Sequence, residues 1–318
     1  MYQFIYWLKA AAAILITNSH YADIWPVSAL AAGGHLGNCL YFFVSGFCLF
    51  YIKDAFPKWY LKRAIRIYPS LWICVAAFLL IGWYHFSSLP AAFSCLIYPT
   101  WFHFIGTIML MYVFFYIVRW AQSKSNLKSQ IVMMQILLIF MGIYIFCFDK
   151  SYYHVDDVNE KWVWFQFAES MLLGALFREK YEAIENRIRW FDIASVSLML
   201  ILYFASKLAF SRIQSLSMFQ CLHPMVLVIL IYRIAVLAIK LEKCGFFAAK
   251  VGVSRVVHLL AAITLEIYLV QYPIIAALKS LVFPLNFLGV TTMVLVCAWG
   301  VRWLSDCIQK KCCKLLKL

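Results

Sequence analysis

Long stretches of almost wholly apolar residues recur along the entire chain, and they restrict it to a membrane architecture. A helix of about 20 apolar residues crosses the hydrocarbon core of a bilayer, which is about 30 Å thick. The mean hydropathy is +0.83, and charged residues make up 13% of the chain, about half of their share in soluble domains. The sequence therefore predicts an all-α, polytopic membrane protein.

The apolar stretches are separated clearly enough to be assigned as individual spans. We expect about ten transmembrane helices over the ranges 4–21, 36–53, 70–86, 99–119, 131–148, 161–177, 191–208, 217–239, 256–278 and 284–304. The first range is not expected to be a cleaved signal peptide, because it lacks a basic start and a small-residue cleavage site. With no linker or repeat between spans, we expect one transmembrane domain over 1–318 and no appended soluble domain.

The basic residues fall mostly on one side of these spans. With the N-terminus placed in the cytoplasm, 21 Lys and Arg residues occupy the inner connections and five occupy the outer ones. This asymmetry predicts that both termini are cytoplasmic. The net charge of +14 follows from the topology, and no basic groove with stacked aromatic residues indicates nucleic-acid binding. The eleven cysteines show no metal-ligand spacing, so we expect no metal.

Lys9 and His20 are polar residues in the first apolar stretch, eleven positions apart. On an α-helix this spacing places both side chains on one face, about 16.5 Å apart along the axis. A cation near one surface and a titratable imidazole deeper in the membrane suit the binding of a charged cofactor and the transfer of a proton. The alternative is a snorkelling lysine and an interfacial histidine with no joint role.

Two further segments carry polar residues beside or within the early spans. Arg63 and Arg66 stand at i and i+3 of an expected short interfacial helix. Their forked donors fit phosphate groups, although attraction to anionic lipid explains them equally well. Ser45 and Gly46 allow a ligand or a backbone to approach the second span closely, whereas plain helix packing is the alternative.

The ninth span contains a polar stripe at i, i+4 and i+7, formed by Thr264, Tyr268 and Gln271. The stripe is either a substrate surface or a set of groups satisfied by facing helices. Glu266 projects from another face of this span. We expect it to pair with Arg233 or Lys9, because an unpaired carboxylate is costly in a bilayer.

Together these segments resemble the acyltransferase-3 family of integral-membrane O-acyltransferases, which acetylate bacterial cell-surface polysaccharides. The resemblance covers about residues 5–275 and rests on the order and spacing of segments rather than on one motif. The segments similar to those of the family are Lys9-x10-His20, Leu40–Phe47, Lys62–Pro69, Trp101-Phe102 with Tyr112, Gly174, and Ile267–Pro273.

Two positions depart from the family pattern. Lys9 stands where the family has arginine, so the charge is kept but the bidentate fork is lost. Gln271 stands where a histidine is common, and an amide cannot titrate. A family mechanism that needs a second imidazole at this position is therefore in doubt.

The resemblance implies acetyl-CoA as the acyl donor and co-substrate, and a hydroxyl of a polysaccharide or lipid-linked sugar as the acceptor. Lys9, Arg63 and Arg66 would then bind the phosphates of the donor. His20 would act as the base, since an imidazole with a reference pKa near 6.5 accepts a proton at neutral pH. Asp23 would orient the ring or the acceptor, unless it is an ordinary interfacial carboxylate. The expected substrate-binding residues are Ser45, Trp101, Glu266, Tyr268 and Gln271.

Two other functions fit part of the pattern. A secondary transporter or flippase would share the spans and the intramembrane charges, but it would also show inverted repeats. We find no second copy of the Lys-x10-His or Arg-x-x-Arg pattern. A catalytically inactive subunit of a polysaccharide-synthesis complex is the third reading, and the departures at Lys9 and Gln271 keep it open.

Overall fold

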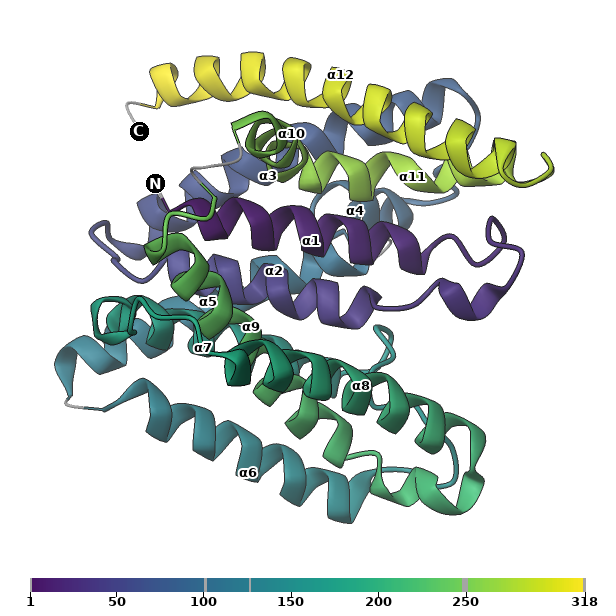
Figure 1. The fold of residues 1–318 in the computed structure, drawn as a ribbon. Helices are drawn as coiled ribbons and strands as arrows, with labels where there is room; N and C mark the ends of the chain where they lie inside the picture. The colour runs from purple at the N-terminus through teal and green to yellow at the C-terminus, as the bar shows by residue number, and fades with distance from the viewer. Residues whose placement is uncertain (1, 100–101, 126, 248–250, 317–318) are drawn as a thin grey trace. The chain divides into compact units, whose positions relative to one another are not determined.

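The computed structural model of the protein describes residues 2–99, 102–125, 127–247 and 251–316. The regular elements of these residues are helices, and they include no strand (Figure 1). The predicted all-α class is therefore confirmed.

The helices follow one another with short connections. In chain order they are α1 (Gln3–Ser19), α2 (Gly34–Cys48), α3 (Phe56–Leu80), α4 (Leu89–Leu96), α5 (His103–Lys124), α6 (Ser129–Cys147), α7 (Val163–Glu179), α8 (Trp190–Arg212), α9 (Leu222–Lys243), α10 (Val251–Ala262), α11 (Thr264–Leu278) and α12 (Leu285–Leu315). Short 3-10 helices lie in the connections at η1 (Ser28–Leu30), η2 (Tyr181–Ala183) and η3 (Gln214–Phe219).

The chain divides into two compact units. Unit 1 comprises Met1–Lys9, Asn38–Ile52 and Phe114–Val257, and unit 2 comprises Ala10–Gly37, Lys53–Val113 and His258–Leu318. Each unit is therefore assembled from three separate stretches of sequence, and neither is a sequential domain.

Each of the ten ranges expected to cross the membrane overlaps an α-helix. In the described part of the chain, six helices are long and apolar enough to span a bilayer, namely α3, α5, α6, α8, α9 and α12. The pair α10 and α11 makes a seventh if it counts as one bent span. Helices α1, α2 and α7 have 17, 15 and 17 residues, somewhat fewer than the roughly 20 of a typical span.

The expected short interfacial helix that carries Arg63 and Arg66 is wrong as a separate element. Both residues lie in α3, which continues from Phe56 through Pro69 to Leu80. The basic residues in the first turns of α3 gave this part of the sequence the composition of a connection. The arginines and the apolar span that follows therefore belong to one helix.

The range 256–278, expected as one span, is broken. Helices α10 and α11 meet with a bend of 70°. The Thr264 hydroxyl lies 3.1 Å from the carbonyl oxygens of both Leu260 and Ala261. A hydroxyl that donates to these oxygens satisfies backbone acceptors released by the bend, which is a condition for irregular backbone at membrane depth.

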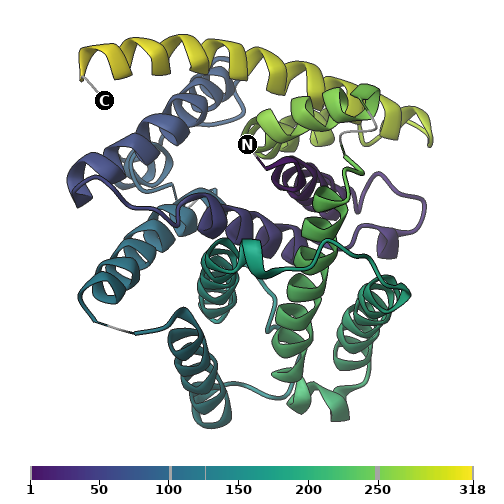
Figure 2. The same cartoon turned by 60° about the vertical axis from the view of Figure 1, so that its left-hand side comes forward.

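Helices α3, α11 and α12 pack against one another in unit 2. The 31-residue α12 lies along both partners, as Figures 1 and 2 show. Near its start, Asn286 Nδ2 donates to the carbonyl oxygen of Ile24 at 3.0 Å. Near its end, Gln309 Nε2 approaches the carbonyl oxygen of Arg66 at 3.4 Å. Ser305 of α12 also lies beside Ser70 of α3, one turn further along each helix in opposite senses, so α3 and α12 run in opposite directions.

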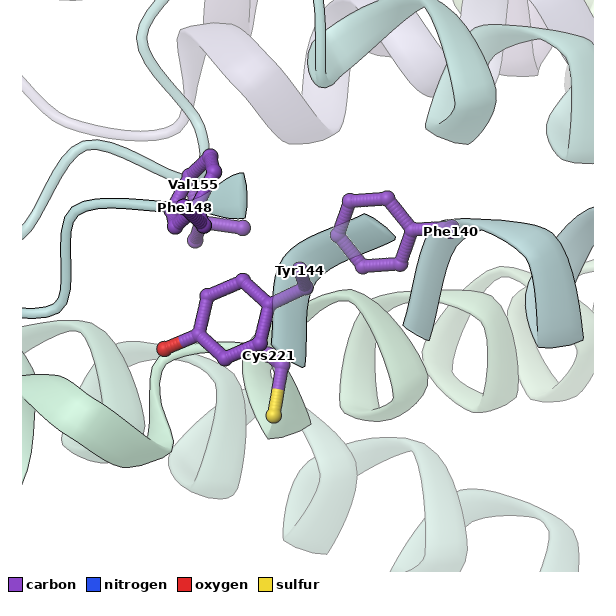
Figure 3. Close-up of a cluster of buried hydrophobic side chains, with 5 residues drawn as sticks. All are labelled: Phe140, Tyr144, Phe148, Val155 and Cys221. Carbon is purple, nitrogen blue, oxygen red and sulfur yellow. The ribbon is translucent and has the colours of Figure 1, made fainter. Parts of the chain in front are cut away.

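Unit 1 contains the helix pairs α8–α9 and α6–α7. Lys240 of α9 forms a buried ion pair with both carboxylate oxygens of Asp192 in α8, at 3.0 and 2.9 Å. At the end of α6, the buried side chains of Phe140, Tyr144, Phe148, Val155 and Cys221 form an apolar cluster (Figure 3). The Tyr144 hydroxyl at its edge donates to the carbonyl oxygen of Met218 at 2.7 Å.

Helices α2 and α7 approach each other closely at two glycines. A Cβ atom on Gly46 would collide with the carbonyl oxygen of Met171, and one on Gly174 would collide with that of Phe43. Each glycine thus makes room for the backbone of the other helix, a packing mode typical of membrane helices. For the Ser45-Gly46 pair, this geometry assigns Gly46 to helix packing.

Replacing Gly174 with valine should prevent stable packing of α2 on α7. The obstacle is backbone rather than a movable side chain, so we expect a loss above the roughly 1–3 kcal/mol of ordinary overpacking. Thermal unfolding of the detergent-purified protein measures this effect. Gly142→Ala in α6 is the control, because nothing lies within 4 Å of a Cβ at that position. Equal unfolding temperatures for the two variants would contradict the prediction.

Candidate functional site

His20 lies immediately after α1, which ends at Ser19. Its backbone N–H donates to the carbonyl oxygen of Thr17 at 3.0 Å, so the chain forms a tight turn there. The helix that carries Lys9 therefore stops one residue short of His20. The imidazole is half-buried in unit 2.

The turn at His20 is fixed by Asn18. The Asn18 Nδ2 donates to the carbonyl oxygens of Leu30 and Ala32 at 2.8 and 3.1 Å. Its Oδ1 accepts from Trp25 Nε1 at 2.9 Å. A short polar side chain that bonds outside the helix competes with helical hydrogen bonding, which explains why α1 ends here. The position of His20 is therefore set by the connection that follows it.

Two tyrosines of α11 contact the imidazole of His20. The ring centroid of Tyr272 lies 5.0 Å away with the planes at 70°, and that of Tyr268 lies 6.5 Å away at 55°. Tyr268 also contacts the rings of Phe102 and Phe104 edge-to-face, at 6.1 and 5.6 Å. Such arrangements suit the charge distribution of aromatic rings. The imidazole is therefore bounded on one side by aromatic rings that carry two hydroxyl groups.

The residues of the predicted polar stripe have separate surroundings. The Thr264 hydroxyl donates to backbone carbonyl oxygens at the bend between α10 and α11. The Tyr268 ring contacts His20. Gln271 is fully buried, and its amide atoms have no hydrogen-bond partner in the part of the chain that the structure describes. Trp101, expected to bind substrate, lies outside the described residues. Tyr268 is thus the member of the stripe that contacts His20.

Glu266 lies in a buried polar cluster formed by α3, α11 and α12. Its Oε1 accepts a hydrogen bond from the Ser70 hydroxyl at 2.7 Å, and Arg302 Nη1 lies 3.6 Å from the same oxygen. Ser305 lies 2.9 Å from Ser70. The Glu266 side chain is fully buried, and among the described residues its Oε2 has no hydrogen-bond partner. The cluster therefore connects three helices through one carboxylate.

Within unit 2 the structure gives Glu266 a cation that the sequence analysis did not name. Arg302 of α12 lies 3.6 Å from its Oε1, while the expected partners Arg233 and Lys9 belong to unit 1 and stay predictions from the sequence. The Cζ atom of Arg233 instead lies 5.2 Å from the ring centroid of Phe191. Arg302 lies inside α12, which continues to Leu315.

Asp23 forms an ion pair with Lys279 at 3.2 Å. Both side chains are more than half exposed, so this pair contributes little to stability. No contact between Asp23 and His20 is present among the described residues. The structure thus gives Asp23 a partner that the sequence analysis did not name.

Arg63 and Arg66 project from the first turns of α3, the former half-buried and the latter exposed. The Arg63 Cζ atom lies 5.0 Å from the ring centroid of Trp59, and its Nε has no hydrogen-bond partner in the described part of the chain. The Nζ of Lys62 donates a hydrogen bond to Asp54 Oδ2 at 2.7 Å, and this bond lowers the pKa of the Asp54 carboxyl. Neither arginine forms an ion pair with a described residue.

Lys9 and Ser45 belong to unit 1, whereas His20 and its aromatic neighbours belong to unit 2. The roles expected for these two residues therefore rest on sequence alone. As for metals, no group of three or more His, Cys, Asp or Glu side chains within the described ranges is arranged to hold an ion.

Sequence reasoning missed several residues of this region. Tyr272 stands four positions after Tyr268, on the same side of α11, and this spacing is the signal that could have found it. The sequence analysis gave Asn18 no role. Ser70 carried no signal, because serine is common where membrane helices pack.

The comparisons with known proteins agree with this architecture at the level of the family. A family model described as an acyltransferase domain, Acyl_transf_3, matches residues 2–303, which is nearly the whole chain. No curated protein and no solved structure matches the chain.

Proposed function

The chain belongs to the acyltransferase-3 family of membrane acyltransferases, and from this premise we propose that it moves an acetyl group from acetyl-CoA to a carbohydrate hydroxyl. The acceptor is a surface or exported polysaccharide, or a lipid-linked sugar. Membership of the family makes the chain an acyl-transfer enzyme and sets the transporter reading aside. The observation that carries the proposal is the half-buried His20 imidazole held against Tyr272 and Tyr268.

His20 acts as the general base in this proposal. An imidazole nitrogen takes the proton of the acceptor hydroxyl, and the oxygen attacks the carbonyl carbon of the thioester. The C–S bond then breaks, and the departing thiolate takes the proton back from the imidazolium. The products are an ester and free CoA, with no covalent acyl-enzyme. The turn held by Asn18 supports this role, because it restrains the base.

Arg63 and Arg66 bind the phosphates of the donor. Two guanidinium groups at i and i+3 of α3, without an ionic partner among the described residues, offer fixed positive charge and forked donors. The excess of basic residues at this end of the spans favours a cytoplasmic position, where acetyl-CoA is available. Lys9 is proposed to add charge for the donor, from its place on α1 before His20.

The acceptor binds beside the aromatic rings around His20. Tyr268 is proposed to contact the sugar, since aromatic faces pack well on sugar rings, and Gln271 and Glu266 offer polar atoms without hydrogen-bond partners among the described residues. Ser45, Trp101 and Asp23 remain proposals from the sequence. The enzyme is proposed to reside in a bacterial plasma membrane with both termini inside.

Mass spectrometry of the surface glycans of the host, with and without the gene, tests the proposed function. We expect an acetyl mass on the glycans that disappears on deletion and returns with the wild-type gene. The purified protein should also release free CoA from acetyl-CoA when a glycan acceptor is added. Unchanged glycans after deletion, together with no CoA release, would refute the proposal.

Substituting Arg63 or Arg66 with alanine should weaken the binding of acetyl-CoA by about tenfold or more, since charge-assisted hydrogen bonds are lost. Binding of S-acetylpantetheine, which lacks the nucleotide and its phosphates, should stay unchanged. Both affinities can be measured by titration calorimetry on the purified protein. Lys58→Ala, in the first turn of the same helix, is the charge-matched control. Equal losses for both ligands would show that the arginines serve the fold or the lipid contact instead.

Tyr272→Leu should lower the rate of transfer by roughly tenfold to a hundredfold, because the edge-to-face contact that orients His20 is lost. Tyr272→Phe keeps the ring and should retain most activity. The effect should appear in kcat rather than in the KM for acetyl-CoA. If Tyr272→Phe loses as much as Tyr272→Leu, the hydroxyl rather than the ring contact matters, and the prediction fails.

A further inference from the structure

Unit 1 contains two arginines that lie on aromatic rings at the end of α2. Arg178 stands near the end of α7, and Arg119 stands near the end of α5. The rings belong to Phe47, Phe50 and Tyr51, at and just beyond the last turn of α2. The sequence analysis gave no role to this group of residues, and the proposed function does not use it.

Arg178 is enclosed by three rings. Its Cζ atom lies 4.6, 5.4 and 5.3 Å from the ring centroids of Tyr2, Phe47 and Tyr51, and it donates a hydrogen bond to the Tyr2 hydroxyl. Aromatic faces attract a guanidinium group but do not neutralise its charge. Arg178 therefore keeps a full positive charge in a fixed position.

Arg119 is held in a similar way. Its Cζ atom lies 4.0 Å from the ring centroid of Phe50, and its Nη1 donates to Gln122 Oε1 at 2.7 Å. Its Nε atom is buried and has no hydrogen-bond partner among the described residues. The rings of Phe50 and Tyr51 contact each other at 4.9 Å. The two guanidinium groups thus lie on two rings that touch.

The carboxylates near these arginines lie beyond ion-pair distance, and Glu179 acts on Arg119 by charge at longer range. Glu242 accepts hydrogen bonds from the backbone N–H groups of Gln3 and Phe4, both at 3.0 Å, so it caps the start of α1. Neither Arg119 nor Arg178 forms an ion pair with any residue that the structure describes. Arg189, in contrast, pairs with Glu185 at 2.9 Å. Two fixed cations that form no ion pair among the described residues can therefore accept an anion from outside the protein.

We propose that Arg119 and Arg178 form a phosphate-binding site at the end of α2. Guanidinium groups present forked donors that match phosphate oxygens, and their stacking on rings reduces the side-chain entropy lost on binding. The Tyr51 side chain is 64% exposed, so a ligand can reach the group from outside. The phosphate comes either from the nucleotide part of the acyl donor or from the head group of an anionic lipid.

Glutamine variants of the full-length purified protein test the site. Arg119→Gln and Arg178→Gln are compared with Arg189→Gln, which removes the same charge in the same unit from a pair that is 59% exposed on both sides. One arm measures the binding of acetyl-CoA against S-acetylpantetheine. The other arm measures the retention of phosphatidylglycerol against diacylglycerol by native mass spectrometry.

We expect Arg119→Gln and Arg178→Gln each to weaken the binding of at least one phosphate-bearing ligand by about tenfold or more. Phosphate-free ligands and Arg189→Gln should show no change. Loss in the first arm assigns the phosphate to the donor, and loss in the second assigns it to a lipid. No loss in either arm, or an equal loss in Arg189→Gln, would overturn the proposal.

Lysine variants keep the test decisive if a glutamine variant fails to fold. Arg119→Lys and Arg178→Lys preserve the charge and the contact with the rings, but they lack the fork. We expect them to fold and to bind the phosphate ligand more weakly than the wild type. Wild-type affinity in both lysine variants would then overturn the site. The test does not depend on His20, so its failure leaves the proposed acyl transfer untouched.

Discussion

Replacing His20 with alanine is expected to lower the rate of acetyl transfer by about 10²–10⁴-fold, the usual contribution of a general base. The loss follows because the region around His20 contains no second imidazole on α11, where Gln271 stands instead. Binding of acetyl-CoA should survive, since the proposed phosphate-binding residues are Arg63 and Arg66 rather than His20. Release of free CoA in the presence of a glycan acceptor measures the rate, and titration calorimetry measures the binding.

His85→Ala is the matched control for this variant. His85 is an exposed residue in the connection after α3, and its removal should leave the rate unchanged. Normal transfer by His20→Ala would rule out the mechanism. A parallel loss of acetyl-CoA binding would instead make His20 part of the donor site.

Replacing Arg302 with methionine is expected to reduce the free energy of unfolding by about 3–5 kcal/mol, because it leaves a buried carboxylate without its cation. Glu266 is fully buried, and Arg302 is the cation beside it. The double variant Arg302→Met with Glu266→Leu removes both charges and should recover most of this loss. Thermal unfolding in detergent, monitored as the fraction of protein that stays soluble on heating, measures both effects.

Asp306→Asn provides the control for Arg302→Met. Asp306 contacts the same arginine at 2.9 Å, but its side chain is 40% exposed, so the change should cost no more than about 1 kcal/mol. If Arg302→Met lowers the free energy of unfolding by no more than Asp306→Asn does, Arg302 does not stabilise the buried carboxylate of Glu266. If the double variant is as unstable as the single one, the loss comes from packing rather than from charge.

Which stretches become helices was predictable, because apolar residues enter a bilayer only as hydrogen-bonded helices. All ten expected ranges overlap helices, but their ends were less certain. The start of α3 was missed because Lys58, Lys62 and Arg63 are typical of a connection, although the helix already begins at Phe56. Hydropathy indicates which residues can be buried in a membrane. A helix, however, continues as long as its backbone groups remain hydrogen-bonded to one another, whether or not its residues are apolar.

The contents of the site were only partly predictable. His20 was chosen as a candidate because an imidazole in an apolar stretch is costly and has few structural uses. Arg302 was not named as a partner of Glu266 because pairing depends on which helices are neighbours, and a single sequence contains no information on that. Tyr272 was missed because tyrosine is common in membrane helices, and only its contact with His20 distinguishes it.

The interleaving of the two units limits how this protein can be divided. The chain passes between the units at five places, and four of them lie inside α1, α2, α5 and α10 as the structure describes these helices. A fragment that contained one unit alone would therefore carry severed helices with exposed backbone groups, which a bilayer does not tolerate. Split versions for complementation or labelling should instead be cut in a connection inside one unit, such as the acidic one between α6 and α7.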